Sequence, residues 1–143
     1  RIRLDLASAP MTAREISDLA ADGFYDGLGW HRVVPNFVVQ GGGFYPDAQG
    51  NWVHIDTGDS VPNEPGRPNI RGTMAMAKRG NAPDSATSEW YFNTVDNASL
   101  DDPTLRELAR SDPRLFLQRF QYSAKRYSPG KALSQSPPPK LPE

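Results

Sequence analysis

Cysteine is absent from this chain of 143 residues. Its absence excludes a disulfide-stapled scaffold, thiol catalysis and zinc sites that depend on thiolates. Histidine is scarce as well, because His31 and His54 are the only two in the sequence. Two histidines do not make a metal site on their own, so they predict no metal chemistry by themselves.

An excess of charge and a long hydrophobic run are also missing. The 16 Lys and Arg residues nearly balance the 17 Asp and Glu residues. Bulk charge therefore supports neither a nucleic-acid-binding role nor a membrane-surface role. No apolar run approaches the roughly 20 residues of a membrane-spanning helix. With 37% hydrophobic residues, the chain is predicted to be globular, with about one domain and no membrane span.

Common catalytic motifs are missing too. The sequence has no G-x-S-x-G nucleophile elbow, and no Gly-Lys-Ser/Thr follows Gly41–Gly43 to complete a phosphate-binding loop. An enzyme built from these residues should catalyse a reaction that needs little acid, base or nucleophile. Rotation about an Xaa-Pro peptide bond is such a reaction. Its barrier of ~20 kcal/mol comes from partial double-bond character, and no covalent intermediate is required.

The stretch Trp30–Gly42 organises the rest of the chain. It is mostly apolar and β-branched, and it predicts two short strands around a break at Pro35-Asn36. Arg32 is a permanent cation at the start of this stretch, where a charge is costly to bury without partners. Arginine keeps its proton and presents planar, oriented donors, which suits stabilisation of a twisted imide nitrogen.

The N-terminal part predicts one strand and one helix. Ile2–Leu6 alternates with period two, which is typical of a strand. Thr12 and Glu15 fit a capping box and therefore predict a helix over about residues 13–22. Gly23 is placed to end this helix.

Beyond the central stretch, the pattern predicts a long loop and two strands. Gly41–Arg71 is rich in Gly, Pro, Asp and Asn, with a short strand expected at Asn51–Ile55. Gly72–Ala77 and Ser88–Asn93 both predict strands. In the second of these strands, Trp90 and Phe92 are expected in the core, and a groove wall is expected from Glu89, Tyr91 and Asn93.

The pattern changes after Leu100. Pro103–Arg110 predicts a helix, and Asp112-Pro113 predicts the start of a second helix. The rest of the chain is basic and Pro-rich, which is typical of an extended or disordered tail. The second helix is expected to carry Phe116, Leu117 and Phe120.

Four separated motifs occur in register along the chain: Phe24–Gly27, Trp30–Gly42, Arg71–Ala77 and Ser85–Asn93. Their order resembles that of the cyclophilin-type peptidyl-prolyl cis-trans isomerases, and the resemblance runs from about Ile2 to Leu100. The segment Asn63–Gly66 and the pair Glu89-Trp90 are most similar to bacterial members.

The resemblance implies a mainly β fold, a closed antiparallel β-barrel with capping helices. Residues 1–100 would form the cyclophilin-like domain, and residues 101–143 a divergent helical, basic, Pro-rich tail. The family's next strands, a Val-Phe-Gly run before a Gly-Met turn, are missing from the sequence. The first strand of the barrel could also precede Arg1. Either the tail closes the barrel differently, or the chain needs a partner to complete it.

The resemblance also implies site residues. Arg32 is similar to the catalytic arginine, and Gln40 to the glutamine that orients this arginine and contacts the substrate. Glu89 stands where glutamine is usual, as a substrate contact or as a partner of Arg32 or Lys78. Ala77 and Lys78 resemble strand-end residues whose backbone binds the peptide. The wall of the proline pocket is implied to consist of Phe37, Val38, Tyr91 and Leu100.

Each of these residues also has a purely structural interpretation. An isolated arginine is more often part of a surface salt bridge, but the flanking motif favours function for Arg32. For Glu89, the two interpretations, a substrate contact and a solvated surface residue, are equally favoured. His31 is expected to be structural, and His54 is expected to be a surface residue of a loop.

Together these observations predict a peptidyl-prolyl cis-trans isomerase that accelerates rotation about Xaa-Pro bonds in protein folding, with Arg32 stabilising the twisted imide. No metal or organic cofactor is implied. Its partners would be proline-containing peptides or proteins and, by resemblance, cyclosporin-type macrocycles, in the bacterial cytoplasm or periplasm. The alternative is a non-catalytic docking subunit of a larger assembly, attached through residues 101–143. RNA binding by Arg114 to Arg126 is a weaker third hypothesis.

Overall fold

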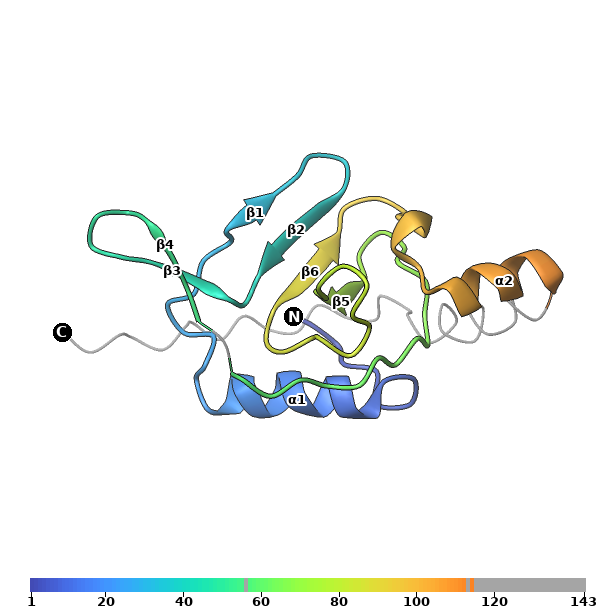
Figure 1. The fold of residues 1–143 in the computed structure, drawn as a ribbon, viewed down its shortest axis with the longest axis horizontal. Helices are drawn as coiled ribbons and strands as arrows, with labels where there is room; N and C mark the ends of the chain where they lie inside the picture. The colour runs from blue at the N-terminus through green and yellow to red at the C-terminus, as the bar shows by residue number, and fades with distance from the viewer. Residues whose placement is uncertain (56, 113, 115–143) are drawn as a thin grey trace, which may run out of the picture.

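The structure, a computed structural model, describes residues 1–55, 57–112 and 114. The described residues form two antiparallel sheets, two α-helices and one 3-10 turn (Figure 1). In chain order the elements are α1 (Pro10–Ala21), β1 (Arg32–Val33), β2 (Val38–Gly41), β3 (Phe44–Pro46), β4 (Trp52–His54), β5 (Met74–Met76), β6 (Trp90–Asn93), η1 (Ala98–Leu100) and α2 (Pro103–Ser111).

The larger sheet has four strands in the order β1-β2-β6-β5, and β3 and β4 form a separate hairpin. All pairs are antiparallel, which confirms the predicted mainly β class. Figure 1 shows α1 running beneath the strands and α2 extending outward from the β6 side. In the part of the chain that the structure describes, β1 and β5 are edge strands, so closure into a barrel stays a prediction.

A tight turn joins β1 to β2 and confirms the predicted break in the central stretch. The Val34 amide donates to the Val38 carbonyl at 2.9 Å, and the Phe37 amide donates to the Val34 carbonyl at 3.2 Å. Asn36 has φ 55°, a left-handed conformation that asparagine tolerates better than most residues. The turn therefore places Phe37 directly after a reversal of the chain.

Helix α1 begins at Pro10, three residues before the predicted start. The predicted capping box is wrong, because Ala9 is the N-cap residue and its side chain has no oxygen that could accept a hydrogen bond from the first amides of the helix. Glu64 replaces it from far along the chain and accepts from the amides of Met11 and Thr12, at 3.2 and 2.7 Å. A carboxylate suits this position because unpaired amides and the helix dipole favour negative charge there.

The predicted end of α1 is confirmed. Gly23 has φ 73°, and the amide of Phe24 donates to the carbonyl of Leu19 at 2.9 Å. This is the left-handed glycine stop that commonly terminates helices.

The predicted strand Ile2–Leu6 is wrong. The side chain of Asp5 accepts from the amides of Ala7 and Ser8, at 3.2 and 3.3 Å, and it pairs with Arg67. Such local hydrogen bonds favour a turn over an extended strand. The period-two pattern was therefore overridden by one aspartate and its long-range partner.

The long loop contains more structure than its sequence indicated. Strand β4 lies within the predicted Asn51–Ile55, but its partner β3 was not predicted. Helix α2 confirms the helix expected from Pro103, while the helix expected to carry Phe116 lies outside the described residues. Leu105 on α2 is buried. The proposed division between residues 1–100 and 101–143 stays a prediction.

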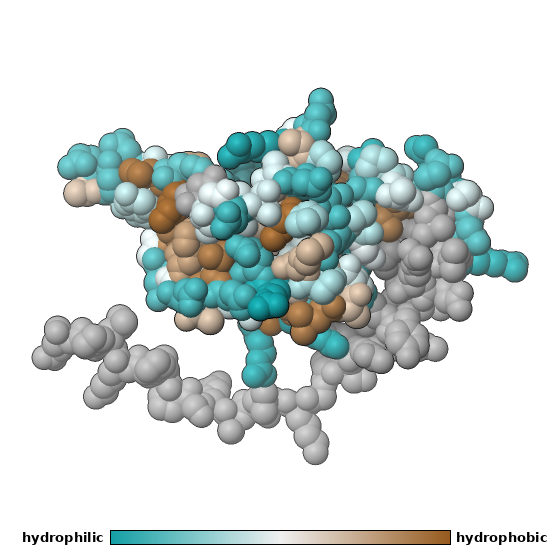
Figure 2. Space-filling model, turned by 60° about the horizontal axis from the view of Figure 1, so that its bottom comes forward, coloured by the Kyte–Doolittle hydropathy of each residue, from teal (hydrophilic) through white to brown (hydrophobic). Residues whose placement is uncertain are grey.

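Trp and Phe rings pack together on one side of the four-stranded sheet. The ring centroids of Trp30 and Trp90 lie 4.9 Å apart, and those of Trp90 and Phe92 lie 5.5 Å apart. Trp30 remains 49% exposed and Val33 62% exposed. Figure 2 brings the α1 side of the molecule forward and shows separate hydrophobic patches among hydrophilic residues. The described helices include none that is long and apolar enough to cross a bilayer.

Candidate active site

Three predicted site residues lie in one row across the larger sheet. Arg32 of β1 is paired with Gln40 of β2, and Gln40 is paired with Tyr91 of β6. Paired residues point to the same face, and neighbouring strands are about 4.8 Å apart. The register therefore brings a cation, an amide and a phenol ring together over about two strand spacings.

Arg32 is exposed but held in place on two sides. One terminal nitrogen, Nη1, donates to Oε1 of Gln40 at 3.2 Å. The guanidinium carbon lies 5.7 Å from the centre of the Phe37 ring, within the range of a cation–π contact. The turn at Asn36 makes this contact possible, because it returns Phe37 to the side of Arg32. The charged group is thus oriented at the surface with free donors.

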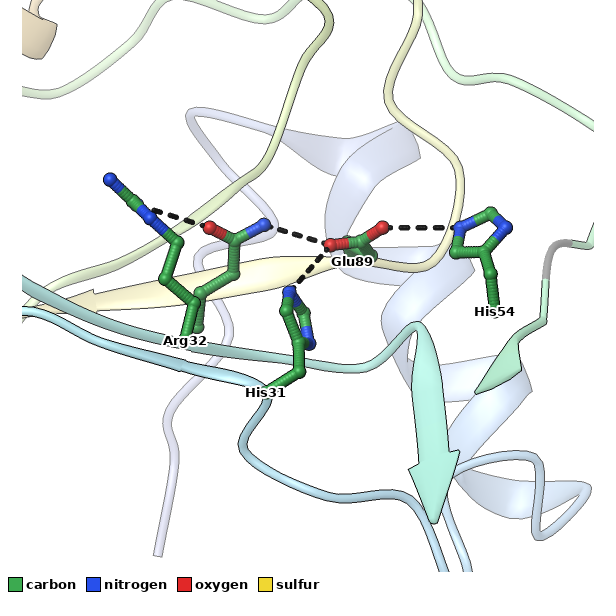
Figure 3. A network of polar contacts seen from close by, with 5 residues as sticks. His31, Arg32, His54 and Glu89 are labelled. Carbon is green, nitrogen blue, oxygen red and sulfur yellow. Dashed lines mark hydrogen bonds and ion pairs between the residues drawn. The ribbon is translucent and has the colours of Figure 1, made fainter. Parts of the chain in front are cut away.

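A polar network continues from Gln40 to Glu89, just before β6. Nε2 of Gln40 donates to Oε2 of Glu89 at 2.8 Å. Nε2 of His31 lies 3.3 Å from the same oxygen, and Nε2 of His54 lies 3.3 Å from Oε1. Figure 3 shows Glu89 between the two histidines, with Arg32 at the far end of the chain of contacts.

The side chain of His31 is 12% exposed, less than that of Glu89 or of His54. Burial lowers its pKa; Glu89 opposes this effect, while His54 and Arg32 reinforce it. Among the described residues its Nδ1 has no hydrogen-bond partner. A carboxylate only accepts hydrogen bonds, so a neutral His31 can be accommodated beside Glu89 at 3.3 Å with its proton on Nε2.

The hydroxyl of Tyr91 is hydrogen-bonded to a buried polar cluster. Its hydroxyl donates to Oδ1 of Asn69 at 2.9 Å, and the amide of Asn69 donates to Oδ1 of Asp101 at 2.7 Å. Burial and, secondarily, the charge of Asp101 raise the pKa of Tyr91 to about 12. Asn93, expected in the groove wall, is instead buried and donates to Asn69 at 3.1 Å. The phenol is therefore neutral and fixed in orientation.

The same cluster reaches Phe37. Nδ2 of Asn97 donates to the Phe37 carbonyl at 2.9 Å and to Oδ1 of Asn93 at 2.8 Å. The amide of Thr94 also donates to the Phe37 carbonyl, at 3.0 Å. The backbone that carries Phe37 is therefore anchored to the segment after β6.

The remaining predicted site residues have different surroundings. Val38 lies on the same face as Gln40 but is only 1% exposed. The amide of Ala77 donates to the carbonyl of Glu89 at 2.8 Å. Lys78 is exposed and donates to Oδ1 of Asn63 at 2.8 Å. Leu100 lies in η1 and is 36% exposed.

Two details of the site differ from the sequence analysis. Glu89 contacts Gln40, His31 and His54, rather than the expected partners Arg32 or Lys78. His54 lies in strand β4 rather than in a surface loop. This placement was missed because the sequence did not predict the partner strand β3, which places Phe44 opposite His54. Within the described part of the chain, no three His, Asp or Glu side chains are placed to hold a metal ion.

A profile of the family described as "Cyclophilin type peptidyl-prolyl cis-trans isomerase/CLD" matches residues 1–108. The chain belongs to this cyclophilin family. This cyclophilin is 43% identical over 100 residues to peptidyl-prolyl cis-trans isomerase A of Dickeya dadantii, covering 70% of the chain and 51% of that relative. It is 42% identical over 94 residues to isomerase B of Escherichia coli, covering 64% and 54%. The chain thus spans about half the length of these curated relatives.

Solved structures support the same fold for this cyclophilin. A cyclophilin-type isomerase of Cryptosporidium parvum, crystallised in the presence of the dipeptide Ala-Pro, has a TM-score of 0.57 and 22% sequence identity. The match covers 69% of the present chain and 63% of that chain. A second structure of the same parasite protein has a TM-score of 0.55 at 22% identity, covering 67% and 60%.

Proposed function

We propose that this chain is a peptidyl-prolyl cis-trans isomerase with Arg32 as its catalytic residue. The observation that supports the proposal most directly is the row formed by Arg32, Gln40 and Tyr91 on one face of the sheet. The row combines an oriented cation with an aromatic surface. Rotation about an Xaa-Pro bond needs no acid, base or nucleophile, so such a row is sufficient for it.

The chemistry follows from the electronic structure of the imide. Twisting the C–N bond removes its partial double-bond character, so the nitrogen becomes pyramidal and regains a lone pair. A guanidinium N–H that donates to this nitrogen binds the twisted form better than the planar form. Gln40 occupies one end of the Arg32 guanidinium at 3.2 Å and leaves other donors for the substrate. Lowering the barrier by roughly 7 kcal/mol corresponds to about five decades in rate.

The substrate would lie along the same face. The rings of Phe37 and Tyr91 would contact the proline, with Val38 beneath them and Leu100 at the η1 end. The segment at Ala77 and Lys78 would bind the peptide backbone. Buried hydrogen bonds to Tyr91 and to the Phe37 backbone support this assignment, because they fix the aromatic residues before a ligand arrives.

Exchange spectroscopy by NMR on an Ala-Pro-containing peptide tests the proposal. The intact chain should accelerate cis-trans exchange, and Arg32→Ala should lower kcat/KM by about 100-fold or more, because the charge that stabilises the twisted imide is lost. Arg32→Lys is the matched control, since it keeps the charge without the planar donors, and it should recover little activity. Equal exchange rates with the original chain and with Arg32→Ala would remove Arg32 from the mechanism.

A non-catalytic docking subunit is the second candidate. The exposed apolar side chains of Trp30 and Val33 favour it, because partly exposed large hydrophobic residues often mark protein contacts. Attachment through residues 101–143 belongs to this hypothesis. Sedimentation of the purified chain separates the two candidates: an intact monomer that accelerates exchange would eliminate a purely docking role.

Two finer expectations follow from family membership. Cyclosporin-type macrocycles should compete with proline peptides, because they would occupy the same face. A bacterial cytoplasmic or periplasmic location is also proposed, on the basis of the bacterial relatives. Competition in the exchange assay tests the first expectation, and fractionation of the source cells tests the second.

A further inference from the structure

We propose that Glu89 is a positioning residue, which fixes the side-chain amide of Gln40 so that its carbonyl oxygen faces Arg32. The inference rests on the proposed isomerase function. It assigns Glu89 a role behind the catalytic group, rather than the direct substrate contact expected from its sequence position.

The two ends of the Gln40 side-chain amide have different partners. Its Nε2 donates to Glu89 at 2.8 Å, and its Oε1 accepts from Arg32 at 3.2 Å. An ionised carboxylate only accepts hydrogen bonds and a guanidinium only donates them. The amide can satisfy both neighbours in one orientation only. A glutamine at position 89 would offer both a donor and an acceptor and would remove this constraint.

The carboxylate of Glu89 is itself contacted on both oxygens. Each Glu89 oxygen is contacted by a different histidine at 3.3 Å, Oε2 by His31 and Oε1 by His54 (Figure 3). The side chain of Glu89 is 19% exposed. Its two oxygens are thus held from separate segments of the chain, which leaves the carboxylate little freedom to turn towards a ligand.

Gly43 leaves space that the side chain of Glu89 occupies. A Cβ atom added to Gly43 would lie 2.6 Å from Cδ of Glu89 and 2.7 Å from its Oε1. Real Cβ atoms do not approach other atoms so closely. Gly43 has no left-handed φ that would itself require glycine. We attribute the absence of a side chain at position 43 to the space that Glu89 occupies.

The experiment compares Glu89→Gln and Gly43→Ala with Glu107→Gln, an exposed control of the same chemistry on α2. Exchange of an Ala-Pro-containing peptide is followed under saturating conditions, and the dissociation constant of the peptide is measured separately. In the same 15N-labelled samples, the side-chain amide signal of Gln40 is recorded without peptide. The control should match the original chain in all three readouts.

Both site variants should shift the Gln40 signal and slow saturated exchange by about tenfold, with the dissociation constant changed by less than about twofold. Gly43→Ala keeps the carboxylate, so it tests the position of Glu89 and not only its charge. An unchanged Gln40 signal in Glu89→Gln would overturn the proposal. So would a tenfold weaker peptide complex with unchanged saturated exchange, which would make Glu89 a substrate contact.

The two proposals fail in different ways. Absence of exchange with the original chain would overturn the isomerase function, while the Gln40 signal would still decide whether Glu89 orients the amide. Normal exchange with an unmoved Gln40 signal in both site variants would overturn only the role of Glu89.

Discussion

The two faces of the four-stranded sheet are stabilised in different ways. We call the side of Arg32, Gln40 and Tyr91 the site face, and the side of Trp90 and Phe92 the aromatic face. The site face depends on directional hydrogen bonds between groups that each have few other hydrogen-bond partners. The aromatic face depends on ring packing at 4.9 to 5.5 Å, which tolerates small shifts.

The geometry of the site and the stability of the sheet therefore depend on different faces. On the site face, replacing one member of a hydrogen-bonded pair leaves the other member without its partner. Ring packing loses free energy in proportion to the buried area removed. Replacements on the site face should therefore alter geometry and exchange, whereas replacements on the aromatic face should alter stability according to burial.

Trp90→Ala should produce the largest loss of stability. Trp90 contacts Trp30, Phe92 and Tyr25 through its ring, so its removal should lower the free energy of unfolding by about 3 kcal/mol. Trp30→Ala should cost about 1 kcal/mol, because that ring is half-exposed. Urea unfolding measures both. If both variants lost the same free energy of unfolding, Trp90 would contribute no more to the packing of the aromatic face than the half-exposed Trp30.

Asn69→Ala should produce a smaller loss, of about 2 kcal/mol, because it leaves the Tyr91 hydroxyl and the Asp101 carboxylate short of partners. Urea unfolding gives the free energy, and exchange spectroscopy should also show slower isomerisation because Tyr91 is no longer fixed. Asn51→Ala is the matched control in an exposed turn and should stay within about 0.5 kcal/mol. Loss of stability without any change in exchange would contradict the link between this cluster and the site face.

Glu64→Gln should cost about 1 kcal/mol at pH 7, as little as Trp30→Ala, and it tests a contact that lies on neither face of the sheet. Partial burial would raise the pKa of Glu64, but hydrogen bonds from Thr12 and Met11 outweigh this effect and lower it. A lowered pKa in the folded state means that the stabilisation is present above the unfolded value and is lost as the pH falls through the folded value.

Thermal or urea unfolding as a function of pH checks this sign. The difference between the original chain and Glu64→Gln should shrink as the pH falls below about 4. A difference that grows on acidification would show that Glu64 does not stabilise α1 as a carboxylate.

Much of the fold and part of the site were predictable from local patterns. The reversal at Pro35-Asn36, the glycine end of α1 and the start of α2 follow from turn and helix chemistry within a few residues. Alternation in β6 correctly placed Tyr91 opposite Trp90 and Phe92. These features depend on neighbours in the sequence, and so the sequence contains the information for them.

The remaining features depend on partners that are distant in the sequence. Glu64 caps α1 from 52 residues away, and Arg67 pairs with Asp5 across 62 residues. His54 reaches Glu89 only because β3, which has a weak strand pattern, pairs with β4. No spacing rule predicts such contacts, since they form only after the strands have assembled.

The most direct test of the account is an NMR titration of the 15N- and 13C-labelled chain with an Ala-Pro-containing peptide. The Arg32 guanidinium, the Gln40 amide and the Tyr91 ring signals should shift together, while cis-trans exchange of the peptide accelerates. The Trp30 indole signal should stay unchanged. Shifts confined to Trp30 and Trp90, or binding at the site face without accelerated exchange, would contradict the central claim.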